Sequence, residues 1–170
     1  MTNYVEWFRS QLQSSGEGFV WAFQQIDPSL RLSLPPRPSY LGTWSPARLV
    51  WHVTEYERCV ALPSMRHFIG GPMLAEDAWP DSDDLWAAAQ KQSSDELVAA
   101  FQAVRDEQIQ LLDDLKTIDW TVPGETVWGL KPLALVVTKT YQHTFEHGDT
   151  LLRMGMWWEQ FERDMAGEAT

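Results

Sequence analysis

The chain has 170 residues, 44% of them hydrophobic and 22% charged, which is the composition of an ordinary globular domain. Its formal net charge of −11 would repel a phosphate backbone, so we expect no nucleic-acid partner. No apolar run is long enough to span a membrane, and the amino terminus lacks the apolar core of a signal peptide. We therefore expect one cytoplasmic domain, residues 1–170, with no membrane partner.

The first two predicted helices cover residues 2–26 and 46–69. In the first, apolar residues repeat at intervals of three and four, and Asp27-Pro28 ends the pattern. The second opens at Ser45-Pro46, an N-cap followed by a proline at the first helical position, and stops before the glycines at 70–71.

Two more long helices are predicted at residues 94–118 and 132–154. The third begins with the capping box formed by Ser93 and Glu96, and the fourth begins near Pro132. A short C-terminal helix at 157–165 is expected to follow. No segment shows the alternating pattern of a β-strand, so the predicted fold is all-α, a four-helix bundle.

Two connections in this bundle are unusually long, residues 28–44 with four prolines and residues 70–92 with five acidic residues. Loops of this length often serve as lids or binding elements. The alternative is that they only connect helices that run in the same direction, which also requires length.

The four histidines are the most informative residues. His143 and His147 are four residues apart on a predicted helix, so both side chains can point to one place. His52 lies in the middle of the second helix. If these two helices pack together, three imidazoles converge with no evident fourth ligand, the pattern of a catalytic metal site.

The alternative is that these histidines are hydrogen-bonded core residues. Against it, Thr140 and Thr144 make the middle of the same helix face polar, and Gln108 does so on the third helix. Burying such groups without partners costs on the order of 1–3 kcal/mol each, and a shared metal or a water-filled cavity would remove that cost. His67, near a helix end, is not expected to be a ligand. Cys59 is seven residues beyond His52, too far along the helix to join the site.

Three further side chains are candidates for a catalytic role. Glu55 and Tyr56 follow His52 by three and four residues, and Glu146 is one turn from His143. Each could orient a ligating imidazole or transfer a proton, because such imidazoles usually donate their second N–H to an acceptor. The alternative for Glu55 is a solvent-facing position, and we expect that position for Glu57.

The order Trp44-Ser45-Pro46, His52 and His143-x-x-x-His147, followed by Leu151-Leu152-Arg153, resembles the DinB-like proteins. The resemblance extends from the first helix to about Arg153. It implies a four-helix bundle with a three-histidine site for a divalent metal, typically zinc or nickel. Characterised relatives depend on thiols: maleylpyruvate isomerases use mycothiol, and transferases use bacillithiol or similar thiols. Here Gly148-Asp149-Thr150 replaces the Gly-Gln frequent after the last histidine, which affects contacts beside the metal ligands.

Several functions follow as alternatives. The first is a metal-dependent enzyme that activates a low-molecular-weight thiol, as a transferase or isomerase, on a small electrophilic substrate. The second is a metal-dependent hydrolase, the third a bundle that binds a small ligand without catalysis, and the fourth a structural protein with core histidines.

The ten tryptophans, and the pair Trp157-Trp158 above all, suggest an apolar surface that a homodimer would cover. The alternative is that these rings close the end of the bundle.

Overall fold

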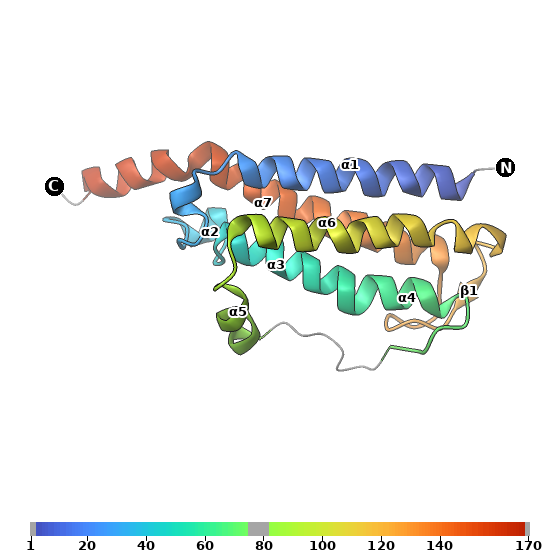
Figure 1. Ribbon diagram of the computed structural model, residues 1–170. Coiled ribbons are helices and arrows are strands. Elements are labelled where there is room, and N and C mark those ends of the chain that lie inside the picture. Colours follow the sequence, from blue (N-terminus) through green and yellow to red (C-terminus); the bar gives the residue numbers. More distant parts are fainter. Residues whose placement is uncertain (1–2, 75–81, 169–170) are drawn as a thin grey trace.

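The computed structural model describes residues 3–74 and 82–168, and this part of the chain forms an all-α bundle (Figure 1). Three of its long members are α1 (Tyr4–Gln24), α6 (Ser94–Leu111) and α7 (Leu133–Glu168). The fourth is a composite of α3 (Pro46–Tyr56), the π-helix η2 (Glu57–Ala61) and α4 (Leu62–His67), which follow one another without a break. The four-helix prediction is confirmed.

Short elements fill the connections. They are η1 (Pro28–Leu30), α2 (Pro38–Leu41), α5 (Asp83–Ala89), η3 (Asp114–Thr117) and an antiparallel pair of two-residue strands, β1 (Pro123–Gly124) and β2 (Lys131–Pro132). None of these was predicted. Gly124 is required in the hairpin, because a Cβ there would lie 2.8 Å from the ring of Phe68.

Capping residues determine where the helices start. Ser45 accepts a hydrogen bond from the Arg48 amide at 3.3 Å, and Ser93 and Glu96 form the complete capping box. The starts predicted at 46, at 94 and near 132 are confirmed. Residue 2, the predicted start of the first helix, lies outside the described residues, and α1 is capped by the Asn3 side chain.

The ends differ more from the prediction. α4 stops at His67 because Gly70 adopts a positive φ of 90° and the Gly71 amide turns back to the Arg66 carbonyl. α6 stops at Leu111, and the tight turn η3 then buries Leu115 in the core. Residues 157–165 are helical as predicted, and they form the last turns of α7.

The helices run up, down, down and up (Figure 1). α1 packs on α6 and α7, and α3 packs on the same two helices. Because the α3–α4 composite and α6 run in the same direction, the chain between them must return along the bundle, which accounts for the length of the 70–92 connection. Its residues 75–81, where we considered a lid, lie outside the described residues.

The connection at 28–44 has a different explanation, since α1 and α3 are antiparallel. It folds over one end of the bundle, where Arg153 of α7 donates to the Tyr40 carbonyl at 2.8 Å. Among the described residues, no helix is both long and apolar enough to cross a membrane.

Two hydrophobic clusters form most of the core. One lies toward the α1 carboxyl end and contains Phe19, Phe23 and Phe101, and the other lies toward its amino end around Phe8, Leu112 and Trp120. Trp158 belongs to the first cluster and is only 3% exposed. The Trp158 side chain therefore closes the end of the bundle. For this residue, the alternative to a dimer contact that the sequence left open is the one observed.

A buried ion pair lies between the clusters. Glu57 is fully buried and accepts hydrogen bonds from the Arg105 guanidinium, from the Gln108 amide at 2.9 Å and from the Thr144 hydroxyl at 3.2 Å. Arg105 also donates to the Leu12 carbonyl, to Ser15 and to Thr144. The expectation that Glu57 faces solvent was wrong, because its helix is covered by neighbours on that side as well.

We predict that Glu57→Ala lowers the free energy of unfolding by about 3–5 kcal/mol, because it leaves the Arg105 charge buried without its counter-ion. Urea denaturation followed by circular dichroism measures the loss.

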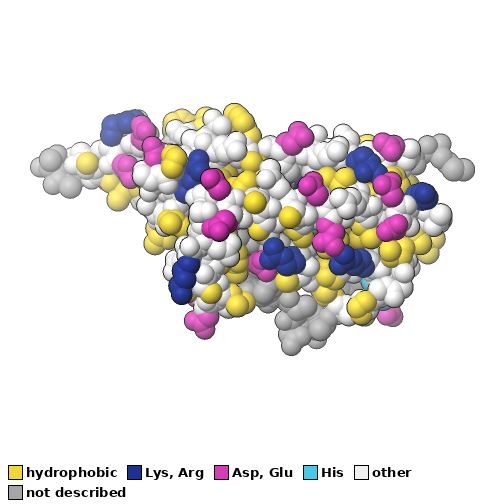
Figure 2. Space-filling view, in the orientation of Figure 1, with side chains coloured by type: hydrophobic (Ala, Val, Ile, Leu, Met, Phe, Trp, Pro, Cys, Tyr) yellow, Lys and Arg dark blue, Asp and Glu magenta, His cyan; other side chains and the backbone are white. Residues whose placement is uncertain are grey.

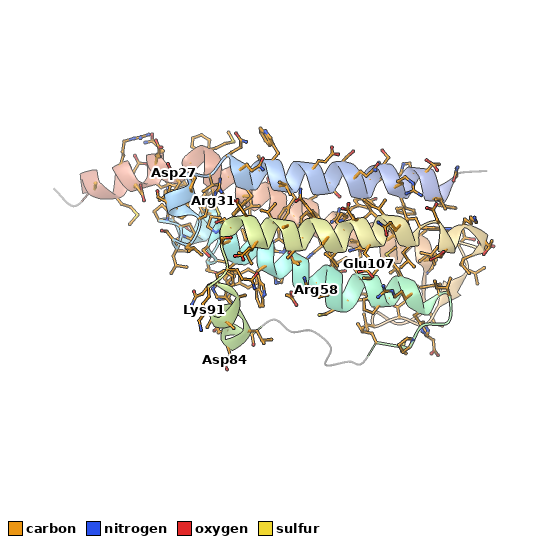
Figure 3. The ribbon with its side chains drawn as sticks, viewed as in Figure 1. Asp27, Arg31, Arg58, Asp84, Lys91 and Glu107 are labelled. Atoms are coloured by element: carbon orange, nitrogen blue, oxygen red, sulfur yellow. The ribbon has the colours of Figure 1, made fainter. Side chains whose placement is uncertain are left out.

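Glu107→Ala is the matched control. Glu107 pairs with Arg66 between α6 and α4, the same two chain segments, but its side chain is 49% exposed (Figure 3). Its loss should cost no more than about 1 kcal/mol. Equal losses in the free energy of unfolding for the two variants would show that the buried ion pair stabilises the fold no more than the exposed one.

Candidate metal centre

Three imidazoles from two helices meet in the interior. His52 lies on α3, and His143 and His147 lie one turn apart on the antiparallel α7. Their Nε2 atoms are close: 3.3 Å from His52 to His143 and 3.1 Å from His147 to His143. One nitrogen from each ring lies within 4.8 Å of the others, and the described residues add no further Cys, Asp or Glu ligand to this group. The convergence predicted from the sequence is confirmed.

Hydrogen bonding alone explains this arrangement poorly. The Nε2 atom of a neutral imidazole carries either one hydrogen or one lone pair, so it can form one good in-plane hydrogen bond. The His143 Nε2 atom, however, lies within hydrogen-bond distance of two imidazole nitrogens, those of His52 and His147. Three nitrogens bound to one tetrahedral ion at about 2.0–2.1 Å would lie about 3.3 Å apart. The two separations that involve the His143 Nε2 atom are close to this value, and all three donor atoms lie within 4.8 Å of one another. The donor set therefore fits a divalent metal.

The electrostatics keep His143 neutral. Burial and the neighbouring His147, His52 and Lys139 lower its pKa from 6.5 to about 2. A neutral imidazole presents the lone pair that a metal requires. His143 and His52 are buried, whereas His147 is half-buried and provides the more open side of the group.

Two aromatic rings flank the imidazoles. The Trp44 ring centroid is 4.7 Å from that of His52, and the Tyr56 ring centroid is 4.2 Å from that of His143. Burial, with the charges of Glu57 and Glu146, raises the pKa of the Tyr56 hydroxyl, so it stays protonated at neutral pH. Tyr56 can therefore act as a hydrogen-bond donor beside the site rather than as a base.

The two predicted carboxylates differ in position. Glu146 is half-exposed, accepts a hydrogen bond from Gln142, and lies close enough to Tyr56 to affect the pKa of its hydroxyl. Glu55 instead pairs with Arg58 and lines a small cavity of about 90 Å³ with Trp51 and with Leu97 of α6. The structure thus brings Tyr56 against His143 and places Glu146 within electrostatic reach of Tyr56. It directs the Glu55 carboxylate to a different side of α3.

The remaining sequence candidates lie elsewhere. His67 is hydrogen-bonded through Nδ1 to the Gly71 carbonyl at 3.0 Å, outside the cluster, as expected. Cys59 is half-buried, with its sulfur 3.8 Å from Glu55, and burial together with the Glu55 charge raises the pKa of its thiol.

Sequence reasoning missed Glu57 and Arg105. The polar residues Gln108 and Thr144, which we attributed to a metal or to water, are bound to this ion pair. The sequence did carry a signal for their burial. Glu57 lies four residues after Val53 and seven after Val50, and Arg105 lies four residues after Phe101, so each shares a helix face with apolar residues. An acid and a base at such apolar positions could have indicated a buried pair.

Comparisons with known proteins support the fold and identify the family. No curated protein matches the chain. One similar solved structure is a histidine-to-alanine mutant of a mycothiol-dependent maleylpyruvate isomerase, with a TM-score of 0.62 and 13% sequence identity. The similarity covers 89% of this chain and 63% of that one, so the chain spans less than two thirds of that protein. The sequence profile of the DinB superfamily matches residues 12–151, and the chain belongs to this superfamily.

Proposed function

We propose that the protein is a divalent-metal-dependent enzyme that activates a low-molecular-weight thiol for reaction with a small electrophilic substrate. The observation that carries this proposal is the convergence of the His52, His143 and His147 Nε2 atoms. We propose these three residues as the metal ligands, with zinc or nickel as the ion, since imidazole suits both.

The bound ion would supply a Lewis acid that lowers the pKa of a coordinated thiol or water. The chain's own residues would do the rest. Trp44 and Tyr56 cover the imidazoles on two sides and limit access of water, and the half-buried His147 leaves one side open. We assign the proton-accepting role to Glu146, because its charge reaches Tyr56 beside His143, although it also pairs with Lys139 at 3.8 Å. Glu55 pairs with Arg58 and lines a different cavity.

The choice of a thiol rests on two considerations. Cys59, the chain's single cysteine, approaches Glu55 rather than the imidazoles and has a raised pKa, so it is a poor nucleophile for this site. An external nucleophile is therefore expected. The structurally similar isomerase depends on mycothiol, which favours a thiol over water, and hydrolysis is the second candidate.

We predict that the purified protein binds one zinc or nickel ion per chain. His143→Ala should weaken the metal affinity by more than about 100-fold. Mutation of a residue that only orients a metal ligand already lowers metal affinity about 10–100-fold, and loss of the ligand itself should lower it further. Isothermal titration with the metal, supported by elemental analysis of loaded protein, measures the change. His67→Ala is the matched control and should bind as the wild type does. Equal binding by all three proteins would remove the histidines from the site.

Removing the metal should leave the bundle folded, because its two hydrophobic clusters do not include the histidines. We expect the helical circular dichroism to be unchanged after chelation. A metal present at 100 times its Kd adds about 2.7 kcal/mol of stability, so its removal should lower Tm by roughly 5–11 °C. Unfolding on chelation would instead indicate a structural metal.

Metal-loaded protein should turn over a reactive electrophile only when a suitable thiol is present. The test is a panel of glutathione, bacillithiol, mycothiol and coenzyme A with electrophilic substrates, run on wild type, His52→Ala and His67→Ala. We expect His52→Ala to fall to the background rate and His67→Ala to retain activity. Thiol-independent turnover of esters would favour a hydrolase, and metal binding without any turnover would favour a ligand-binding bundle.

A further inference from the structure

Trp44 lies where the chain enters α3, and its ring covers one of the proposed metal ligands. Ser45 is the extended N-cap of α3, with φ −64° and ψ 154°, and Pro46 occupies the first helical position. A residue just before an N-cap often folds back on the first turns of its helix. The half-buried Trp44 does so and reaches the imidazole of His52, with the ring centroids 4.7 Å apart at an interplanar angle of 54°.

The segment before Trp44 is held by α7, the helix that carries the other two histidines. Arg153 of α7 donates to the Tyr40 carbonyl at 2.8 Å. Gly42 adopts a positive φ of 88°, and a Cβ there would lie 3.5 Å from the Thr150 methyl group. The backbone that leads to Trp44 is therefore fixed against α7, one turn beyond the last histidine. What remains to be fixed is the direction of the indole ring.

Arg48 provides this restraint. Its guanidinium carbon lies 4.8 Å from the centroid of the Trp44 ring. Because Arg48 precedes His52 by four residues, the two side chains share a face of α3, and the indole contacts both of them. A cation over the face of a tryptophan is attracted by the ring, and more strongly where water is partly excluded. The contact therefore opposes movement of the indole away from His52.

Arg48 differs from other arginines of the bundle in its burial. Acidic and basic side chains are interspersed over the face drawn in Figure 2. Two arginines that pair with such acids, Arg58 and Arg66, have side chains that are 47% and 46% exposed, and exposed pairs restrain a side chain only weakly. The Arg48 side chain is 17% exposed, and its Nη2 atom also lies 2.7 Å from the Oδ1 atom of Asp83.

Asp83 is supplied by α5, and its position depends on the packing of that helix. α5 begins at Asp83 and packs on α3, near the end at which α3 begins (Figure 1). The Trp86 ring of α5 lies 5.7 Å from the Trp51 ring of α3, measured between centroids. α5 thus places a carboxylate against the Arg48 guanidinium and supports it from the side away from the helix axis of α3.

We propose that Arg48 is a positioning residue of the metal centre and acts on His52 through Trp44. The guanidinium holds the indole over the imidazole, and the indole restricts rotation of the His52 ring. A rotated ring would turn its Nε2 atom away from that of His143, which lies 3.3 Å from it. The effect on a bound ion rests on the proposed function, whereas the restraint on His52 belongs to the protein without metal.

Labelling of histidines with diethylpyrocarbonate, followed by mass spectrometry of the labelled peptides, measures this restraint in metal-free protein. Arg48→Gln keeps a side chain of similar length and removes the cation. We expect its His52 to be labelled roughly tenfold faster than in wild type, which corresponds to about 1.4 kcal/mol. Arg48→Lys should give an intermediate rate, because an ammonium group attracts the ring but does not stack on it.

Arg58→Gln is the matched control, since it removes an exposed arginine from the same chain segment, and its His52 should be labelled at the wild-type rate. His67 should be labelled equally in all of these proteins, and circular dichroism checks that each is folded. Equal labelling of His52 in Arg48→Gln and wild type would overturn the proposal. Equal rates in Arg48→Gln and Arg48→Lys would overturn it as well, because the cation would then play no part.

Cobalt(II) tests the same role on a bound ion. Loss of a residue that orients a metal ligand commonly weakens binding by about 10–100-fold, so Arg48→Gln should release cobalt to a chelator at least roughly tenfold faster than wild type or Arg58→Gln. Equal release rates would show that Arg48 does not position the ligand. Wild-type protein that binds no cobalt would instead contradict the proposed function, and the labelling rates of His52 would still decide the role of Arg48.

Discussion

The architecture depends on one buried ion pair, that of Glu57 and Arg105. Its hydrogen bonds reach all four long helices: Leu12 and Ser15 on α1, Glu57 at the start of η2, Arg105 on α6 and Thr144 on α7. Removing two charges from water costs several kcal/mol per ion, and only a fully bonded arrangement offsets that cost. The bundle therefore has one favourable register at this level, because sliding a helix by one turn would leave a charge without its partners.

This register also positions the imidazoles. Thr144, which bonds to both members of the pair, is the neighbour of His143, and Glu57 follows Tyr56, which packs on His143. The two helices that carry the histidines are thus held together one residue away from the site. A site on rigid helices with such support keeps its donor atoms in place before any ligand binds, which reduces the cost of binding.

Different sides of the bundle carry different features. The histidines lie between α3 and α7, and the small cavity with Glu55 lies between α3 and α6. The topology makes this separation possible, since each helix pair forms its own surface.

The sequence by itself determined the helical class, the starts of the helices and the common face of His143 and His147. These depend on local chemistry: capping side chains, apolar repeats and the i, i+4 spacing of His143 and His147 act within a few residues. Only the tertiary structure decided the direction of Glu55, the burial of Glu57 and the partners of Gln108 and Thr144. Each depends on which helix covers a given side of another, and one helix does not specify its neighbours. The same reason explains why Trp158 is buried in the core while Trp7 and Trp21 remain 44% and 56% exposed.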